Sequence, residues 1–298
     1  MRGVKWRCTV SKGTLAQAVG KFAQVTQGAP DGALDRAWAW GSYDSEGVRF
    51  AFFRTYEELR ELTVRLADER VVGGAALSSA QRILARYHAA YRDLDAVLLG
   101  VVFAMADTPP SKSEWTVRQV VSHIVLADVF FYGAVRYALE RHRSGDGRPA
   151  KIPEEAWDVL VGMDEASFEA LLASPLPDLR AWHATFHEKV LRELADIAET
   201  ELDLPSMYWE AEPMSVRFRL HRFDSHMRQH TVQADKTLAF IGCGPKEAKR
   251  LLRLIYAALA EVEGAMIGAW DVGVALRGEV AEAIVGRAEE IAGILTDE

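Results

Sequence analysis

Apolar residues recur every three or four positions over most of the chain, which is the spacing of amphipathic helices. Leu84, Tyr87 and Tyr91 begin one such stripe, which continues through Leu94 and Leu98. The pattern is clearest between residues 79 and 240, and it predicts a bundle of long core-facing helices. The four expected helices cover about 79–102, 115–141, 178–200 and 215–240.

The second of these helices follows a proline pair in "DTPPSKSE", where Ser111 and Glu114 have the spacing of a capping box. Its middle, "VVSHIVLADVFF", is apolar on nearly every side, so we expect neighbouring helices to bury it. About thirty residues separate it from the third helix and include a short helical pattern, "DEASFEALLA". This connection is long enough to cross the bundle.

The two ends of the chain show different patterns. The first 76 residues contain short β-rich runs, "VKWRCTV", "RAWAWGSY" and "VRFAFF", with helical spacing in "TLAQAVGKFAQV" and "TYEELRELTVRLADE". They predict a small βαββα unit, and the glycines and serines of "VVGGAALSS" place a boundary near residue 76. Two further helical patterns lie at about 246–266 and 276–296. We therefore expect a mainly α chain: an α/β unit at 1–76, a four-helix bundle at 77–244 and a helical extension at 245–298.

Composition narrows the classes of function. The 35 basic and 43 acidic residues give a net charge of -8, which disfavours nucleic acid and anionic membranes as partners. "MRGVKWRCTV" does not resemble a secretory signal, and the near-apolar run at 96–106 is too short to span a bilayer. Cys8 and Cys243 are isolated and are interpreted as reduced thiols. We expect a soluble cytoplasmic protein that acts on a small molecule, and we leave open whether it is a monomer or a homodimer.

Two histidines four residues apart stand out in "LHRFDSHMRQHTVQADKTLAF". On a helix His226 and His230 flank the apolar stripe on the same side, so both imidazoles can reach one cation. His123 lies in the apolar "VVSHIVLAD" of another helix, where a buried imidazole needs a hydrogen-bond partner or a metal. The three can form a site with open positions for water or substrate, but a solvated pair and a core histidine are the simpler alternatives.

Other polar residues compete for such a role. His183 and His187 in "WHATFHEKV" are also four apart; we interpret His183 as a core histidine hydrogen-bonded near the site rather than a metal ligand. Arg222 lies one turn before His226 and can hold an anionic group of a substrate. The simpler interpretation is a solvated face, which it would share with Arg219, Gln229 and Gln233. The remaining histidines are placed in solvent (His221), at a helix edge (His88) and in a loop (His142).

The chain resembles the DinB/YfiT family of metal-binding four-helix proteins. "EWTVRQVVSHIVLAD" is similar to the family's second helix, which bears one histidine, and "HRFDSHMRQHTVQ" to its fourth, which bears two. The resemblance covers about residues 78–242 and places the family's three ligands on His123, His226 and His230. It implies a divalent metal such as nickel or zinc, and it implies a low-molecular-weight thiol as cosubstrate, because some members are thiol transferases or thiol-dependent isomerases.

Three functions follow from these residues. The first is metal-dependent S-transfer or isomerisation of a small electrophile, in which a metal-bound thiol ionises to the nucleophilic thiolate. The second is a non-catalytic metal-binding or stress-response module. The third is a metal-dependent hydrolase that uses water in place of the thiol. We see no glycine-rich phosphate loop, nucleophile elbow or H-E-x-x-H motif.

Overall fold

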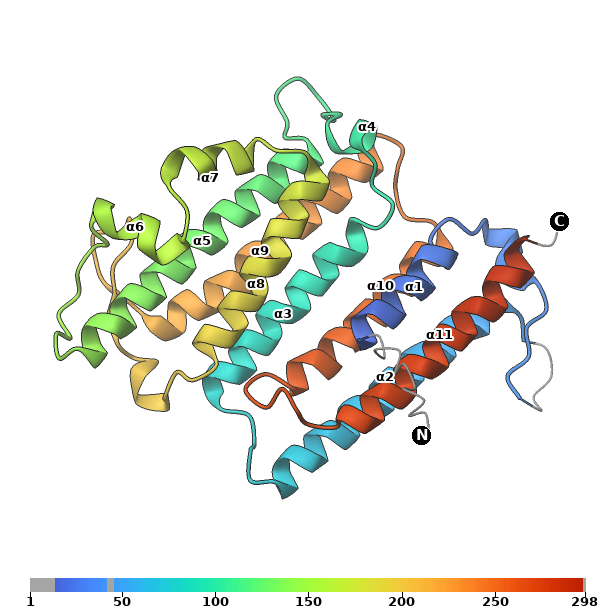
Figure 1. Ribbon diagram of the computed structural model, residues 1–298. Coiled ribbons are helices and arrows are strands. Elements are labelled where there is room, and N and C mark those ends of the chain that lie inside the picture. The colour runs from blue at the N-terminus through green and yellow to red at the C-terminus, as the bar shows by residue number, and fades with distance from the viewer. Residues whose placement is uncertain (1–13, 42–45, 297–298) are drawn as a thin grey trace, which may run out of the picture.

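The computed structural model describes residues 14–41 and 46–296 and is built from helices (Figure 1). Three of them begin with a capping box, in which Thr14, Ser78 and Thr116 pair with a glutamine three residues later. The helices are α1 (Leu15–Thr26), α2 (Val48–Val72), α3 (Ser79–Val97), α4 (Phe103–Ala106), α5 (Val117–Arg143), α6 (Glu154–Val161), α7 (Glu165–Leu172), α8 (Leu176–Leu194), α9 (Val216–Phe240), α10 (Glu247–Ala265) and α11 (Val274–Thr296). Short 3-10 turns lie at Asp31–Asp35 and Glu199–Glu201.

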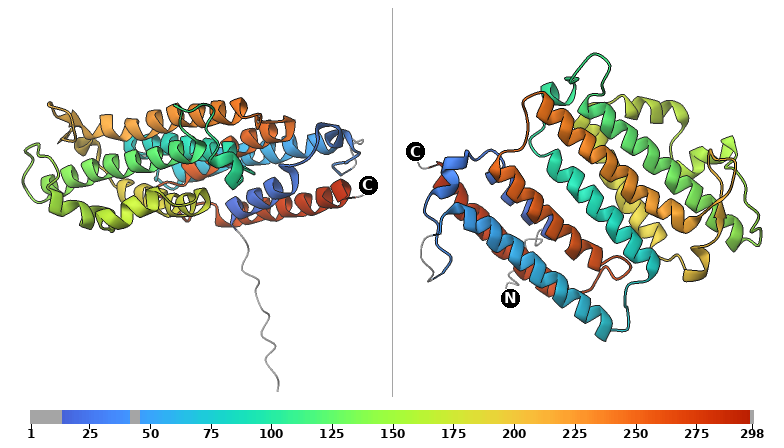
Figure 2. Two further views of the ribbon diagram at one scale, coloured as in Figure 1. Left: turned by 90° about the horizontal axis from the view of Figure 1, so that it is seen from above. Right: turned by 180° about the vertical axis from the view of Figure 1, so that it is seen from behind.

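The long helices form two layers. Figure 2 (right) shows α2, α10, α3, α9 and α5 side by side, and helices that are neighbours in this order pack against each other. On one side of this layer α8 contacts α3 and α5, while α1 and α11 pack together over α10 and α2. The four predicted bundle helices are therefore α3, α5, α8 and α9, and the mainly α class is confirmed.

Two hydrophobic cores fill the space between the layers. One lies inside the bundle and includes the stripe Leu84, Tyr87, Tyr91, Leu94 and Leu98. The other is shared by α1, α2, α10 and α11, with side chains such as Phe22, Phe52 and Ile255. The helices from the two ends of the chain thus form this second core together, because each buries its apolar face against the others. The predicted boundary near residue 76 falls in the turn between α2 and α3.

The α/β character predicted for the N-terminal unit is wrong for its described part. The run "VRFAFF" at 48–53 begins α2 instead of forming a strand. Val48, Ala51, Phe52 and Thr55 are buried at spacings of three and four, so helical packing overrides the β propensity of the run. Residues 36–41 of "RAWAWGSY" form no strand. The run at 4–10 lies outside the described residues.

Two local details of the bundle differ from expectation. The cap of α5 is Thr116 with Gln119; Ser111 and Glu114 form only a backbone turn before it. Between α8 and α9 the chain forms a two-residue antiparallel pair, β1 (Pro205–Ser206) and β2 (Met214–Ser215). The loop between these strands reaches back over the bundle toward α5, and β1 contacts α5.

Helix α5 is long and apolar enough to cross a membrane, with a mean hydropathy of 1.3 over its most apolar window. Two thirds of that window (67%) is buried inside the structure. Its apolar surface is therefore covered by neighbouring helices, as in the core helix of a bundle.

Candidate metal centre

Three histidines from two helices meet at one end of the bundle. His123 is half-buried on α5, while His226 and His230 are buried one turn apart on α9. Each offers a ring nitrogen, and these nitrogens all lie within 4.8 Å of one another. Nε2 of His226 is 3.2 Å from Nε2 of His123. Among the described residues no other group of three histidine, cysteine or acidic side chains is arranged in this way.

The donor set fits a divalent cation. Two nitrogens that bind one tetrahedral zinc ion at roughly 2.0–2.1 Å lie about 3.3 Å apart, close to the separation between His123 and His226. Neutral imidazole is a ligand that suits zinc, nickel, copper and iron. Nδ1 of His226 is buried without a hydrogen-bond partner among the described residues. The ring therefore makes its polar contact through Nε2, which faces His123.

The surroundings favour neutral imidazoles. Burial, together with smaller contributions from positive charge on His230, His123 and Arg222, lowers the pKa of His226 to about 3. Burial also lowers the pKa of His123, as does charge on His230. A metal needs the unprotonated ring, so these rings are ready to bind at neutral pH without releasing a proton.

Packed side chains fix the orientation of the rings. Nδ1 of His230 donates to Oε1 of Gln233 at 2.8 Å, which leaves Nε2 as the unprotonated nitrogen. Trp115 lies against two of the rings, 5.0 Å from His123 and 6.4 Å from His230 between ring centroids. Phe131 meets His226 edge-on. The Gln233 partner lies three residues after His230, a spacing that is visible in the sequence.

Two separate cavities open on the three histidines. The larger, of about 720 Å³, reaches His123 and His226 between α5, α9 and the loop that joins β1 and β2. Its walls include Phe131, Tyr208, Trp209 and Phe218. The smaller, of about 340 Å³, reaches His230 beneath Trp115 and is lined by Glu114, Gln233 and Lys236 among others. Cavities of these sizes can enclose small organic molecules.

Among the described residues, one arginine in the wall of the larger cavity forms no ion pair with a carboxylate. This arginine is Arg222, with Ser225 as its hydrogen-bond partner and its guanidinium 5.7 Å from the Phe131 ring centre. Arg219, by contrast, is buried and makes a bidentate pair with Glu210. The solvated-face interpretation is therefore wrong for Arg219, whose partner comes from the loop between the strands.

The histidines of α8 belong to a different network. His183 Nε2 and the Tyr87 hydroxyl both bond to Asp128 Oδ2, at 3.0 and 2.7 Å. Burial raises the pKa of Asp128. Within the bundle His183 is thus a hydrogen-bonded core histidine, as predicted, and its partner is an aspartate of α5.

The second histidine of α8 takes part in a hydrogen-bond network that extends to α10. His187 Nε2 is 2.9 Å from His88 Nδ1, and His88 Nε2 is 2.8 Å from Glu263, which also pairs with Arg92. Burial opposes ionisation of Glu263, but the charge of Arg92 and the His88 hydrogen bond lower its pKa to about 2. His88 is consequently a buried link between helices, so the helix-edge interpretation is wrong. His221 is exposed, and so is His142, which lies in the last turn of α5 instead of a loop.

A helical bundle with three histidines gathered from its second and fourth long helices defines a class of candidate metal-binding proteins. The family model described as the DinB superfamily matches residues 86–234, which include all three histidines. The chain belongs to the DinB superfamily. No curated protein and no solved structure matches it at a significant level.

Proposed function

We propose that the chain binds one divalent cation, nickel or zinc, through His123, His226 and His230, and uses it to join a thiol to a small electrophile or to isomerise that electrophile. The observation that carries the proposal is the convergence of three imidazole nitrogens within 4.8 Å, with one cavity reaching His123 and His226 and another reaching His230. Three neutral ligands leave the charge of a cation uncompensated and coordination positions free.

A divalent cation at this place would lower the pKa of a thiol that binds it, so that the thiolate forms near neutral pH. In S-transfer the thiol sulfur forms a bond to the electrophilic carbon, the leaving group departs with its electron pair, and the thiol proton passes to solvent. Isomerisation requires addition to an activated double bond, rotation and elimination of the same thiol. Neither reaction needs a nucleophile from the protein.

The two cavities supply room for two reactants. We assign the electrophile to the larger cavity, whose aromatic walls would cover a flat apolar group and exclude water. Arg222 would hold an anionic group of this reactant, because it is the wall cation without a carboxylate partner. The smaller cavity would take the polar part of the thiol beside Gln233 and Lys236.

The arrangement favours a thiol over water as the nucleophile. In the part of the chain that the structure describes, no carboxylate makes a hydrogen bond to the three imidazoles. Hydrolysis would therefore lack a general base held against the histidines to take a proton from water. Glu114 lines the smaller cavity without a hydrogen bond to them. Glu210 and Asp224 line the larger cavity, but each is paired with an arginine, Arg219 and Arg228.

Binding and turnover test the proposal in turn. We expect L-cysteine to change the absorption spectrum of the nickel-loaded protein and to conjugate with an aryl carboxylate electrophile. Arg222→Gln should raise KM about ten-fold for that electrophile and leave KM for its neutral amide unchanged, since only the carboxylate loses a charged partner. The matched control is Arg148→Gln, because Arg148 is exposed, pairs with Asp146 and lies outside the cavity. A metal spectrum insensitive to every low-molecular-weight bacterial thiol, together with no turnover, would replace this function by that of a binding module.

A further inference from the structure

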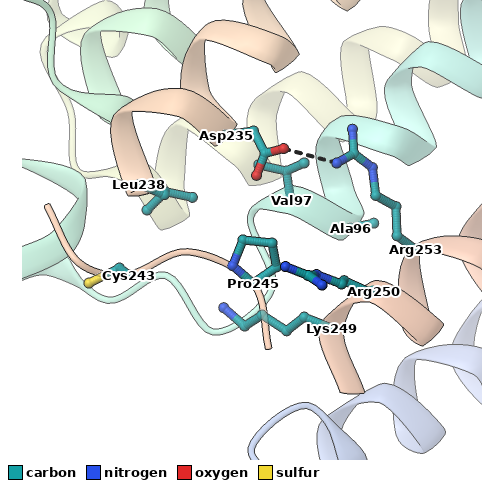
Figure 3. Close-up of a pocket in the computed structure, with 9 residues that line it drawn as sticks. All are labelled: Ala96, Val97, Asp235, Leu238, Cys243, Pro245, Lys249, Arg250 and Arg253. Carbon is teal, nitrogen blue, oxygen red and sulfur yellow. Dashed lines mark hydrogen bonds and ion pairs between the residues drawn. The ribbon is translucent and has the colours of Figure 1, made fainter. Parts of the chain in front are cut away.

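A third cavity lies within the layer of α3, α9 and α10, away from the three histidines. It has a volume of about 40 Å³ and is bounded by α3, the end of α9, the following turn and the beginning of α10 (Figure 3). Three of its lining side chains are cationic and one is acidic. These are Lys249, Arg250 and Arg253, with Asp235 as the acid.

The carboxylates near this cavity are already paired with Arg253. Arg253 makes a bidentate pair with Asp93 of α3, at 2.6 and 3.0 Å. Its remaining nitrogen donates to Asp235 of α9 at 3.0 Å (Figure 3). Arg253 and its two carboxylates thus form a closed cluster that holds α10 against α3 and α9. This cluster leaves no carboxylate for the other two cations.

Lys249 and Arg250 have no hydrogen-bond or ion-pair partner for their side chains among the described residues. Figure 3 shows both extending from α10 toward Pro245. Arg250 is exposed at the rim, whereas Lys249 is half-buried. Burial lowers the pKa of Lys249, which means that its charged form is held at a cost that a bound anion would offset.

We propose that this cavity binds a small oxyanion, such as a phosphate or a sulfate, between Lys249 and Arg250. A cavity needs roughly 10–15 Å³ for each water molecule, so this one holds about three, which is close to the space of one tetrahedral oxyanion. The lysine supplies a point charge and the arginine a planar fork that matches two oxyanion oxygens. The net charge of -8 on the whole chain repels anions at long range, so binding depends on these two local partners.

Isothermal titration of the full-length protein with inorganic phosphate, at constant ionic strength, tests this site. We expect saturable one-to-one binding, with affinity about ten-fold weaker in Lys249→Gln and in Arg250→Gln, because each loses one charge-assisted hydrogen bond. Lys151→Gln is the matched control: it removes one positive charge at an exposed position outside the cavity and should leave affinity unchanged.

Two further titrations distinguish this site from the histidine centre. His230→Ala, which removes a proposed metal ligand, should bind phosphate as the unchanged chain does. Acetate in place of phosphate should bind more weakly, since it offers fewer oxygens. Equal phosphate affinity in Lys249→Gln, Arg250→Gln and Lys151→Gln would overturn the proposal, as would non-saturable heats or loss of binding in His230→Ala. Because Arg250 is exposed, its variant keeps the test valid if Lys249→Gln does not fold.

Discussion

Nε2 of His123 and Nε2 of His226 lie 3.2 Å apart, although the two residues are separated by 103 positions in the chain. The contact exists because α5 and α9 pack side by side, and each helix presents its histidine at the same level. Two unprotonated nitrogens that face each other at this distance repel, unless a proton or a cation lies between them. The packing of two helices thus creates a place that a cation would stabilise.

The first prediction concerns the ligands themselves. His123→Ala and His230→Ala should each sharply reduce the metal bound after identical dialysis, because a three-nitrogen site loses a third of its ligands. His183→Ala should keep most of the metal, since His183 bonds to Asp128 instead. Elemental analysis of the three variants decides the matter. Full occupancy in the first two variants, or a loss confined to His183→Ala, contradicts this assignment.

The second prediction concerns the partner of His230. Gln233→Leu removes the oxygen that accepts from Nδ1 of His230, so the ring is freer to rotate or to change tautomer. Metal affinity should fall about ten- to a hundred-fold, the usual cost of such a loss. Competition with a chelator gives the affinity. Gln229→Leu is the matched control on the exposed face of α9, and an equal loss in both variants would rule out the positioning role of Gln233.

The third prediction concerns Glu263, which joins α10 to α3. Glu263→Gln should lower the free energy of unfolding by about 3 kcal/mol, because His88 stays buried without its carboxylate partner and Arg92 keeps only its pair with Asp95. Glu261→Gln, on the same helix, breaks only an exposed pair with Arg60 and should cost less than about 1 kcal/mol. Urea unfolding at pH 7 measures both. Similar losses in the two variants would show that the buried network does not hold α10 against α3.

The fourth prediction is a dependence of stability on pH. Burial holds the pKa of His187 well below its usual value of 6.5, so the unfolded chain takes up a proton that the folded chain refuses. The free energy of unfolding should therefore fall as pH drops below 6.5, with this residue contributing up to about 1.4 kcal/mol per pH unit. Urea unfolding of the metal-free protein between pH 6 and pH 5 should give a shallower slope for His187→Gln. The exposed His142→Gln serves as the control, and an unchanged slope in His187→Gln would contradict the prediction.

The positions of the long helices could be predicted from the sequence to within two residues for α5 and α9, but the expected ranges 79–102 and 178–200 run past the ends of α3 and α8, at Val97 and Leu194. The expected range 215–240 compares with Val216–Phe240 for α9, and 115–141 with Val117–Arg143 for α5. Helical periodicity is a local property, so a stripe of apolar side chains reveals it before any contact is known. The grouping of His226 with His230 follows from the same periodicity, the apolar neighbours of His123 on another helix made it the candidate third ligand, and the family resemblance placed its ligands on the same three residues.

The secondary structure predicted for residues 48–53 was wrong because this short run fits both the two-residue period of a strand and the 3.6-residue period of a helix. Residues 48–53 are apolar or aromatic except for Arg49, so alternation and helical spacing cannot be distinguished within six residues. The choice was made by tertiary packing, because Phe52 meets Phe22 edge-on in the core that α1 and α2 share with α10 and α11. A helix buries that face against three others, which an isolated strand at the same place would not do.

By itself the sequence determined the approximate ranges of the bundle helices, which face of each is buried and which histidines share a face of α9. Only the tertiary structure decided the partners: that Arg219 is neutralised by Glu210, that His88 joins His187 to Glu263, and that two cavities open on the three histidines. The physical reason is the distance along the chain over which each interaction acts. Periodicity and capping act within a turn or two of helix, whereas burial, ion pairing and cavity shape depend on segments that the fold brings together from distant parts of the chain.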